Sequence, residues 1–547
     1  MRRILTLSFM LVVLATARFS LAQVATGTPP FGSFGGGPVD TINLSNLNSH
    51  VEIPVVNKAG RGLPFSYIFS YDSSVWHPVG SWQHDPNWGW RGQVEIASGY
   101  VSYRVVQTDC NIGTSTDPFY YYYNKYTFTG YHDMNGTGHS FTKYVYDDDT
   151  CSSYKPYPTL PYSATVTLGD GSGLTIYVAA SPSATVYPKS GGSIEPPLQN
   201  TSAAAATTTD FNGNQVTTTD GVNFKDTLGT TVLSITGNAQ SGSVTYTFQT
   251  TTGINVVTVT YSLFTVQTSF GCSNIAETTV GGVYLPVSVS RSDGISQNTY
   301  QFTYEQTPGK PSTYTTARLT TITLPTGGTI EYSYNNGGLA SGIASEGIVC
   351  ANGSTAGITR TLSPASGVNE GSGTYSRGGS SPAWTTTVTD PAGNDTYLQF
   401  QDIYETQRDM YSGLKSGGNI LQTIYTCYAG AAYPCNATSI AMPPTRRTVT
   451  TAANGYYKQI DTTFDPYTNP LVTKEYDFGS GSPGGLLRET DITYATISGG
   501  IVDRPSDIVV KDGSGNKASE TKYSYDGSAL TATSGSPGPI TLTTLLR

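Results

Sequence analysis

Two imidazoles and a carboxylate lie close together in the sequence, at His132, Asp133 and His139. Such side chains can hold a metal ion, but three ligands around one turn are few for a metal centre. We favour a surface turn with incidental histidines and therefore predict no metal site. All five histidines lie in the first part of the chain: His50, His77, His84, His132 and His139.

Consecutive acidic residues offer a second possible chemistry. Asp147, Asp148 and Asp149 could bind calcium weakly, but successive residues of a strand point to opposite faces and cannot all reach one ion. We therefore expect these carboxylates to be solvated.

Motifs for covalent or phosphate chemistry are absent from the sequence. It contains no His-Glu-x-x-His, no Gly-x-Ser-x-Gly, no phosphate-binding loop and no EF-hand loop. The paired carboxylates of a glycosidase leave no sequence pattern, because they are defined by their separation in space. We predict no catalytic residue, no cofactor and no enzymatic activity; an extracellular glycan hydrolase is the second alternative function.

Four of the five tryptophans form a cluster: Trp76, Trp82, Trp88 and Trp90. Exposed indole rings can stack on sugars, so the cluster is a possible ligand platform of a carbohydrate-binding surface module. The other interpretation, which we favour, is that the rings fill the space between two sheets. Exposure of the rings distinguishes the two.

The chain has six cysteines: Cys110, Cys151, Cys272, Cys350, Cys427 and Cys435. An even number favours disulfides in an exported protein, although fifteen full pairings are possible. Order along the chain suggests three sequential pairs, first with second, third with fourth and fifth with sixth. The alternative is that several remain free and buried. The lack of Cys-x-x-Cys argues against a redox dithiol and a zinc knuckle.

The first residues have the pattern of a secretory signal peptide. Arg2 and Arg3 precede an apolar run, and Ser20-Leu21-Ala22 predicts cleavage before Gln23. An uncleaved anchor would need about 20 apolar residues, and Arg18 interrupts the run. The net charge of -9 with no basic run disfavours partners such as nucleic acid or anionic membranes. We therefore expect a secreted or cell-surface protein.

Composition indicates an all-β protein of multiple antiparallel sheets and hairpins, with very little helix beyond the signal peptide. Charged residues are only 12%, whereas Gly (61) and Tyr (39) are abundant, which suits tight turns and pleated surfaces. A chain of 547 residues exceeds one hydrophobic core. We predict a signal peptide (1–22), a Tyr/Trp-rich, sandwich-like β-domain (23–160), a middle β-region (161–300) and a β-hairpin region (301–547).

Periodicity places the first hairpin near the N-terminus. Leu63, Phe65, Tyr67, Phe69 and Tyr71 alternate with other residues, so one face of a strand carries them all. The β-branched run 51–56 precedes it, and the segment 57–62 supplies the turn. A second hairpin is expected around the Asn-Gly of 134–138. Two low-complexity stretches, 202–207 and 367–381, are expected to be linkers or loose loops.

Turns built on Asp, Pro and Gly recur along the rest of the chain, between Val/Thr/Ile/Tyr-rich runs. An Asp that bonds its own backbone, followed by Gly at positive φ, closes a short loop between antiparallel strands. Each such Asp is therefore predicted to be a turn former. The turns lie at 170–173, 210–214, 226–229, 324–328, 390–394 and 512–516.

These motifs together resemble those of secreted bacterial RHS/YD-repeat proteins, in their N-terminal, non-toxin region. The resemblance rests on the Gly-rich lead at 30–37, on Asp-Pro-x-Gly-Asn at 390–394, and on the pairs Tyr476-Asp477 and Tyr525-Asp526. Regularly spaced tandem copies are absent. The resemblance implies a non-enzymatic, exported shell or scaffold that is the structural part alone, either a truncated carrier or a subunit lacking the C-terminal payload, with a toxin or payload chain as partner. The tryptophan cluster gives carbohydrate as the other possible partner.

Overall fold

The computed structural model describes residues 25–59, 63–91, 95–154, 159–198, 205–251, 253–292, 297–338, 344–365, 371–497 and 499–525. The predicted signal peptide and its cleavage site lie outside the described residues, as does the centre of the first hairpin turn, 60–62. In the described part of the chain, no helix is long and apolar enough to cross a membrane.

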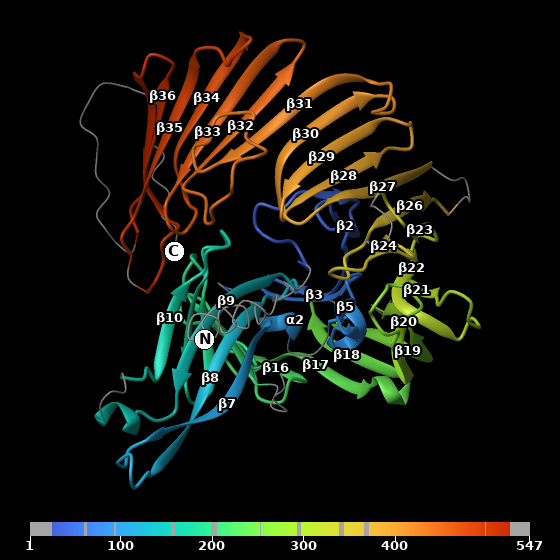
Figure 1. The fold of residues 1–547 in the computed structure, drawn as a ribbon, viewed down its shortest axis with the longest axis vertical. Helices are drawn as coiled ribbons and strands as arrows, with labels where there is room; N and C mark the ends of the chain where they lie inside the picture. Colours follow the sequence, from blue (N-terminus) through green and yellow to red (C-terminus); the bar gives the residue numbers. More distant parts are fainter. Residues whose placement is uncertain are drawn as a thin grey trace, which may run out of the picture.

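The protein is all-β, as predicted, and one sheet dominates it (Figure 1). Among the described residues this sheet has 26 strands, hydrogen-bonded in the order of the sequence. Successive strands pair antiparallel through short turns, and the ladder continues past residue 300 without a break. Where the structure describes the chain, helical structure is limited to α2 (Glu95–Ser98) and three short 3-10 turns, η1 (Pro86–Gly89), η2 (Thr150–Ser153) and η3 (Ala239–Ser241).

The first fourteen strands of the large sheet are β10 (Ser163–Thr167), β11 (Thr175–Ala179), β12 (Ser183–Tyr187), β13 (Ser193–Glu195), β14 (Ala206–Thr209), β15 (Gln215–Thr218), β16 (Asn223–Asp226), β17 (Thr231–Asn238), β18 (Ser243–Thr250), β19 (Gly253–Gln267), β20 (Thr279–Ser292), β21 (Gln297–Gln306), β22 (Tyr314–Thr323) and β23 (Thr329–Asn335). The remaining twelve are β26 (Gly357–Ser363), β27 (Gly371–Ser380), β28 (Ala383–Thr389), β29 (Asp395–Gln401), β30 (Tyr404–Ser412), β31 (Asn419–Tyr428), β32 (Arg446–Ala453), β33 (Tyr456–Phe464), β34 (Pro470–Ser480), β35 (Leu486–Tyr494), β36 (Pro505–Asp512) and β37 (Lys517–Lys522). The short pair β24 (Ala344–Ser345) and β25 (Ile348–Val349) stands apart.

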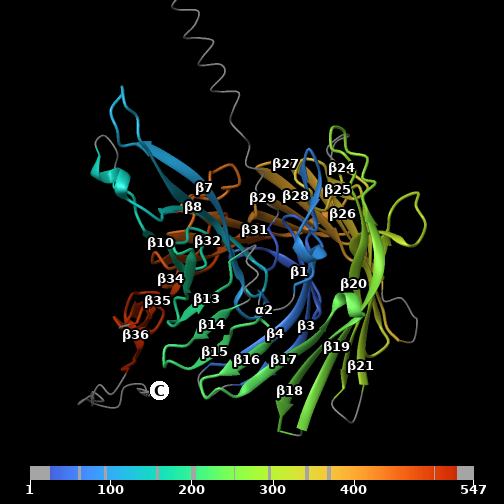
Figure 2. The same ribbon diagram turned by 90° about the horizontal axis from the view of Figure 1, so that it is seen from below.

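The N-terminal segment 25–91, which we call the plug, lies inside the curve of the large sheet (Figure 2). It contains β1 (Phe34–Gly36), β2 (Asp40–Asn43), β3 (Ser49–Lys58), β4 (Phe65–Asp72), β5 (Trp76–Val79) and β6 (Ser81–His84). The predicted first hairpin is confirmed as the β3–β4 pair. Its aromatic row is buried, since Phe65, Tyr67, Phe69 and Tyr71 are at most 7% exposed.

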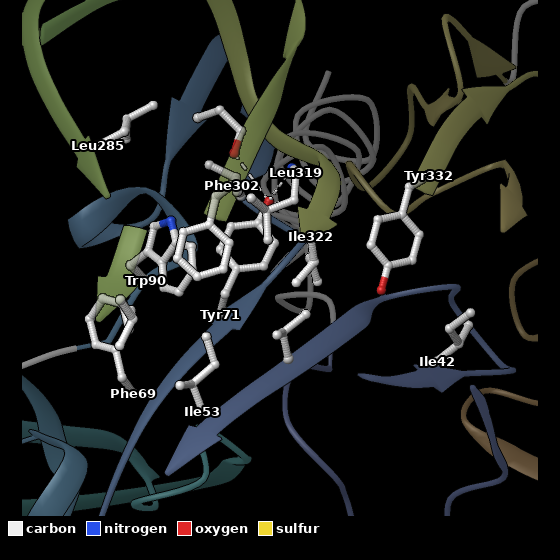
Figure 3. Packing of buried hydrophobic residues seen from close by; sticks show 14 of the residues in the cluster. Ile42, Ile53, Phe69, Tyr71, Trp90, Leu285, Phe302, Leu319, Ile322 and Tyr332 are labelled. Atoms are coloured by element: carbon white, nitrogen blue, oxygen red, sulfur yellow. Dashed lines mark hydrogen bonds between the residues drawn. The ribbon is translucent and has the colours of Figure 1, made fainter. Parts of the chain in front are cut away.

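Long-range contacts fix the plug to the sheet. The Tyr71 hydroxyl donates to the Ala317 carbonyl and accepts from the Leu319 amide, both at 3.1 Å (Figure 3). Farther along the sheet, Arg360 binds both carboxylate oxygens of buried Asp40 at 2.7 Å. One apolar cluster therefore includes plug residues and sheet residues as far as Phe400.

A three-stranded arm projects from the body (Figures 1 and 2). It consists of β7 (Tyr100–Asn111), β8 (Tyr120–His132) and β9 (Gly138–Tyr146), and the predicted Asn-Gly hairpin is its β8–β9 turn. The base of the arm packs on the first strands of the large sheet through Phe128, Val145 and Ile176.

The two ends of the large sheet meet at a seam of loops. Thr468, between β33 and β34, donates a hydrogen bond to the Gly171 carbonyl at 2.8 Å. The Val502 amide donates to the Lys189 carbonyl at 2.9 Å. The sheet therefore closes on itself through its turns, around the plug.

The linker expectation was wrong for much of the second low-complexity stretch. Residues 371–380 form β27, which pairs with β26 and β28 along its length. Part of the first stretch likewise enters β14. Their backbones complete the hydrogen bonds of neighbouring strands, which composition does not reveal; residues 202–204 and 367–370 lie outside the described residues.

Candidate functional site

The tryptophan cluster is not an exposed platform. Trp76, Trp82 and Trp90 are 1%, 0% and 4% exposed, and only Trp88 is partly exposed. The rings lie between the plug and the large sheet, where Trp76 donates to the Thr316 carbonyl at 2.7 Å. The interpretation as a space filler therefore holds, and the cluster gives no support to a carbohydrate-binding surface.

The histidine turn between β8 and β9 is more than an incidental surface turn, which corrects the sequence interpretation. His139 is 4% exposed, and its Nδ1 lies 2.6 Å from an oxygen of Asp170, in the β10–β11 turn. Its Nε2 lies 3.5 Å from Asp133. The second carboxylate comes from another turn, so the local pattern at 132–139 could not reveal it.

The pKa values of the two histidines of this turn are shifted in opposite directions. Burial alone would lower the pKa of His139, but hydrogen bonds to Asp133 and Asp170 outweigh it and raise the pKa to about 9. Burial lowers the pKa of His132 to about 4, and the positive charges of Arg91 and His139 contribute. At neutral pH the site therefore contains one imidazolium and one neutral imidazole.

A pocket of about 450 Å³ opens beside this pair. Four segments that are distant in the sequence surround it: the start of the plug, the base of the arm, the β10–β11 turn and the β29–β30 turn. Tyr404 enters from the last of these, and burial, with the charges of Asp170 and Asp402, raises its pKa to about 12. We take this pocket as the candidate site, and Asp170 and Tyr404 are the members that the sequence did not predict.

A second buried ionic cluster lies in the plug at Asp72. One carboxylate oxygen lies 3.1 Å from His50 Nδ1 and accepts from the Gly27 amide at 2.9 Å; the other binds Arg91 at 2.7 Å. Burial would raise the pKa of Asp72, yet the charges of His50 and Arg91 hold it well below its usual range. The cluster joins the start of the plug to β3, β4 and Arg91.

The recurrent Asp turns are hairpin turns, as predicted. Asp390 Oδ1 accepts from the Asn394 amide at 2.8 Å, and Gly393 has φ 84°. Asp210 and Asp512 accept the same bond from Asn214 and Asn516. The acidic run 147–149 is also bonded rather than simply solvated, because Asp148 accepts from the Tyr121 hydroxyl at 2.7 Å.

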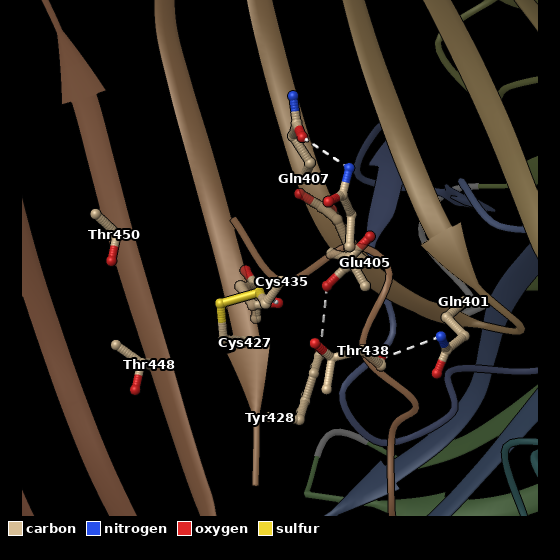
Figure 4. Close-up of a disulfide and its surroundings, with 12 residues drawn as sticks. Gln401, Glu405, Gln407, Cys427, Tyr428, Cys435, Thr438, Thr448 and Thr450 are labelled. Atoms are coloured by element: carbon tan, nitrogen blue, oxygen red, sulfur yellow. Dashed lines mark hydrogen bonds between the residues drawn. A yellow bond between two sulfur atoms is a disulfide. The ribbon is translucent and has the colours of Figure 1, made fainter. Parts of the chain in front are cut away.

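All six cysteines are paired in the sequential order that the chain suggested. The bonds join Cys110 to Cys151, Cys272 to Cys350, and Cys427 to Cys435. The last closes a loop over β31, next to a hydrogen bond from Gln401 to the Thr438 carbonyl (Figure 4). Within the described ranges, no group of three or more His, Cys, Asp or Glu side chains is arranged to hold a metal ion.

No protein-family model matches the chain, and no curated protein matches it. A porin-like protein from Bacteroides uniformis is similar at 11% identity, over 51% of this chain and 87% of its own, with a TM-score of 0.16. TcdB2-TccC3 is similar at 10% identity, over 89% of this chain and 31% of its own, with a TM-score of 0.24. TcdB2-TccC3 without its hypervariable C-terminal region is similar at 9% identity, over 83% of this chain and 22% of its own, with a TM-score of 0.22. The chain thus spans about a third of the TcdB2-TccC3 chain.

Proposed function

We propose that this chain is an exported structural scaffold of the RHS/YD-repeat kind and that it is not an enzyme. The observation that carries the proposal is the single sheet, hydrogen-bonded in sequence order, that wraps the plug and meets itself at the seam. A sheet of this kind builds a wall from a simple repeated unit, the hairpin, and the plug supplies the apolar surface that the wall needs.

Two further observations support an exported scaffold. Three disulfides suit an oxidising environment. The carboxylates of the recurrent turns accept hydrogen bonds from their own backbone, as Asp465 does from the Asn469 amide at 2.8 Å. These acids are engaged in holding hairpins. By the motif resemblance, the partner of the scaffold would be a payload polypeptide.

The test is to cleave the chain within the large sheet and to measure whether the two fragments stay associated. A specific protease site is inserted after Lys415, in the loop between β30 and β31, and the purified protein is nicked without reduction. No disulfide crosses this position, so only non-covalent contacts, such as those of Phe31 with Phe464, join the two fragments. We expect the nicked protein to elute as one particle with unchanged exposure of Trp fluorescence to a quencher.

Dissociation of the fragments in buffer would contradict a continuous scaffold. The non-enzymatic part is tested separately, by incubating the uncut protein with a panel of soluble glycans and measuring reducing ends. We expect no release above a heat-denatured control. Turnover that disappears in a single carboxylate variant would favour the glycan hydrolase instead.

A further inference from the structure

The pocket beside His139 has a lining that the scaffold role does not use. Its walls come from the plug, the arm and two turns of the large sheet, and its volume of about 450 Å³ lies within the range of small-molecule sites. The ion pair of His139 with Asp170 at 2.6 Å joins two of these walls. The shape of the pocket is therefore fixed by a buried contact.

The one positive charge beside the pocket is already held by two carboxylates. The His139 imidazolium lies between Asp133 and Asp170. Each carboxylate also accepts backbone amides, from Thr137 at 2.8 Å and from Ser172 at 2.9 Å. An anionic ligand would find no free positive charge here, because the His139 imidazolium is already paired with Asp133 and Asp170.

The groups that remain available are hydroxyls and rings. Ser102, Ser140 and Tyr404 line the pocket, and their hydroxyls donate to no other described residue. The neutral ring of His132 stacks on Tyr100 with centroids 4.6 Å apart, which fixes its orientation at the pocket wall. Hydroxyl groups beside aromatic rings match a ligand with many hydroxyls and an apolar ring face.

We propose that this pocket binds a neutral saccharide of one or two sugar rings. The hydroxyls of Ser140 and Tyr404 would bond sugar hydroxyls, and the His132 ring would face the C–H side of a sugar. The site is separate from the tryptophan cluster, and its occupation does not depend on the scaffold role.

The experiment uses the full secreted chain with D-glucose, D-galactose, N-acetylglucosamine, maltose and cellobiose as probes. Saturation-transfer NMR identifies which probe binds, and calorimetry gives its Kd. Tyr404→Phe and Ser140→Ala each remove one hydroxyl and should weaken binding about fivefold, the loss expected for one hydrogen bond. Tyr120→Phe, at a tyrosine 50% exposed on the arm and away from the pocket, is the matched control and should leave the Kd unchanged.

Several outcomes would overturn the proposal. The first is that none of the five probes saturates the protein below ~50 mM, which is far weaker than ordinary small-molecule sites. The second is that glycerol binds as well as the sugars. The third is that calcium or inorganic phosphate binds in place of sugar. An unchanged Kd in both Tyr404→Phe and Ser140→Ala would also reject this pocket. Ser140 is exposed on its strand, so Ser140→Ala keeps the test valid even if Tyr404→Phe disturbs folding.

Discussion

The two halves of the large sheet are stabilised by different means. From β16 to β30, residues such as Phe224, Leu285 and Leu398 are buried in one apolar cluster with the plug. From β34 to β37, no described side chain is buried. Hydrogen-bonded ladders are continuous in both halves. The two halves therefore differ in the burial of their side chains and not in the pairing of their backbones.

Charged pairs replace burial in the second half. The register places Asp461, Lys474, Glu489 and Lys511 opposite one another on successive strands from β33 to β36. Lys474 and Lys511 approach Glu489 at 3.2 Å and 2.7 Å. We call this row the charge ladder. Exposed ion pairs contribute little and are screened by salt, so this half should be the first to open.

The largest predicted effect is loss of a plug ring. Trp90 packs on Phe69 and Phe302 with ring centroids 4.7 Å and 4.9 Å apart. Trp90→Ala should reduce the free energy of unfolding by about 3–5 kcal/mol, the usual cost of deleting a buried aromatic side chain. Urea unfolding followed by circular dichroism measures it. Ile460→Ala, at a side chain 43% exposed on β33, is the control and should cost about 1 kcal/mol or less; equal costs would remove the difference between the halves.

Alkaline pH should weaken the plug before the charge ladder. Burial alone would lower the pKa of His50, but Asp72 and Glu52 raise it to about 9. Because the folded pKa lies above the unfolded value of about 6.5, the stabilisation is complete below pH ~6.5 and is lost as pH rises through ~9. The loss should be on the order of 3 kcal/mol, since a pKa difference of one unit corresponds to about 1.4 kcal/mol.

Urea midpoints between pH 6 and pH 10 test this, with His50→Gln as the variant that should flatten the profile. His139 titrates in the same direction, with a pKa of about 9, so some dependence should persist in that variant. A midpoint that rises with pH would contradict the assignment.

Two matched turns compare the halves directly. Gly393 and Gly515 both have φ 84°, and a Cβ at either would meet no atom within 4 Å. Alanine at either position should cost about 1 kcal/mol through backbone strain alone. Global urea unfolding should register the Gly393→Ala cost, whereas Gly515→Ala should mainly accelerate hydrogen exchange in β36 and β37.

Asp390→Asn should reduce the free energy of unfolding only slightly, because Asn forms the same turn. A larger cost than that of Gly393→Ala would indicate that the charge of Asp390 matters.

The smallest predicted effect concerns the charge ladder. Glu489→Gln removes the carboxylate shared by two lysines and should cost under about 1 kcal/mol. Raising the salt concentration should speed amide exchange in β35 of the parent and have little effect in the variant. If exchange in β22 responded equally to salt, the charge ladder would not be the local cause.

Local patterns in the sequence predicted local structure well. The alternation of Phe65, Tyr67, Phe69 and Tyr71 identified both the strand and its buried face, because side chains of a strand point alternately to two faces. Asp followed by Gly identified the turns. Several turns were missed, and in one of them, 465–469, Thr468 takes the glycine position with φ 60°. Thr seldom adopts this conformation, so the motif gave no signal.

Contacts between distant segments could not be predicted. Nothing near Asp40 in the sequence indicates that Tyr332, 292 residues away, donates to it at 2.8 Å. His139 likewise gave no sign of Asp170, and this omission led to the wrong interpretation of the turn as incidental. The pocket that these residues help to form therefore had no sequence signature.

The sequence by itself determined the fold class and many of the hairpins and turns, because each depends on residues a few positions apart. That the strands join one large sheet in sequence order was decided by the tertiary structure. Only the tertiary structure decided that the tryptophans are buried, that the plug lies within the sheet and that Gly171 meets Thr468 at the seam. The physical reason is twist. Each strand pair adds a small rotation, and the accumulated curvature of many pairs determines which distant turns meet.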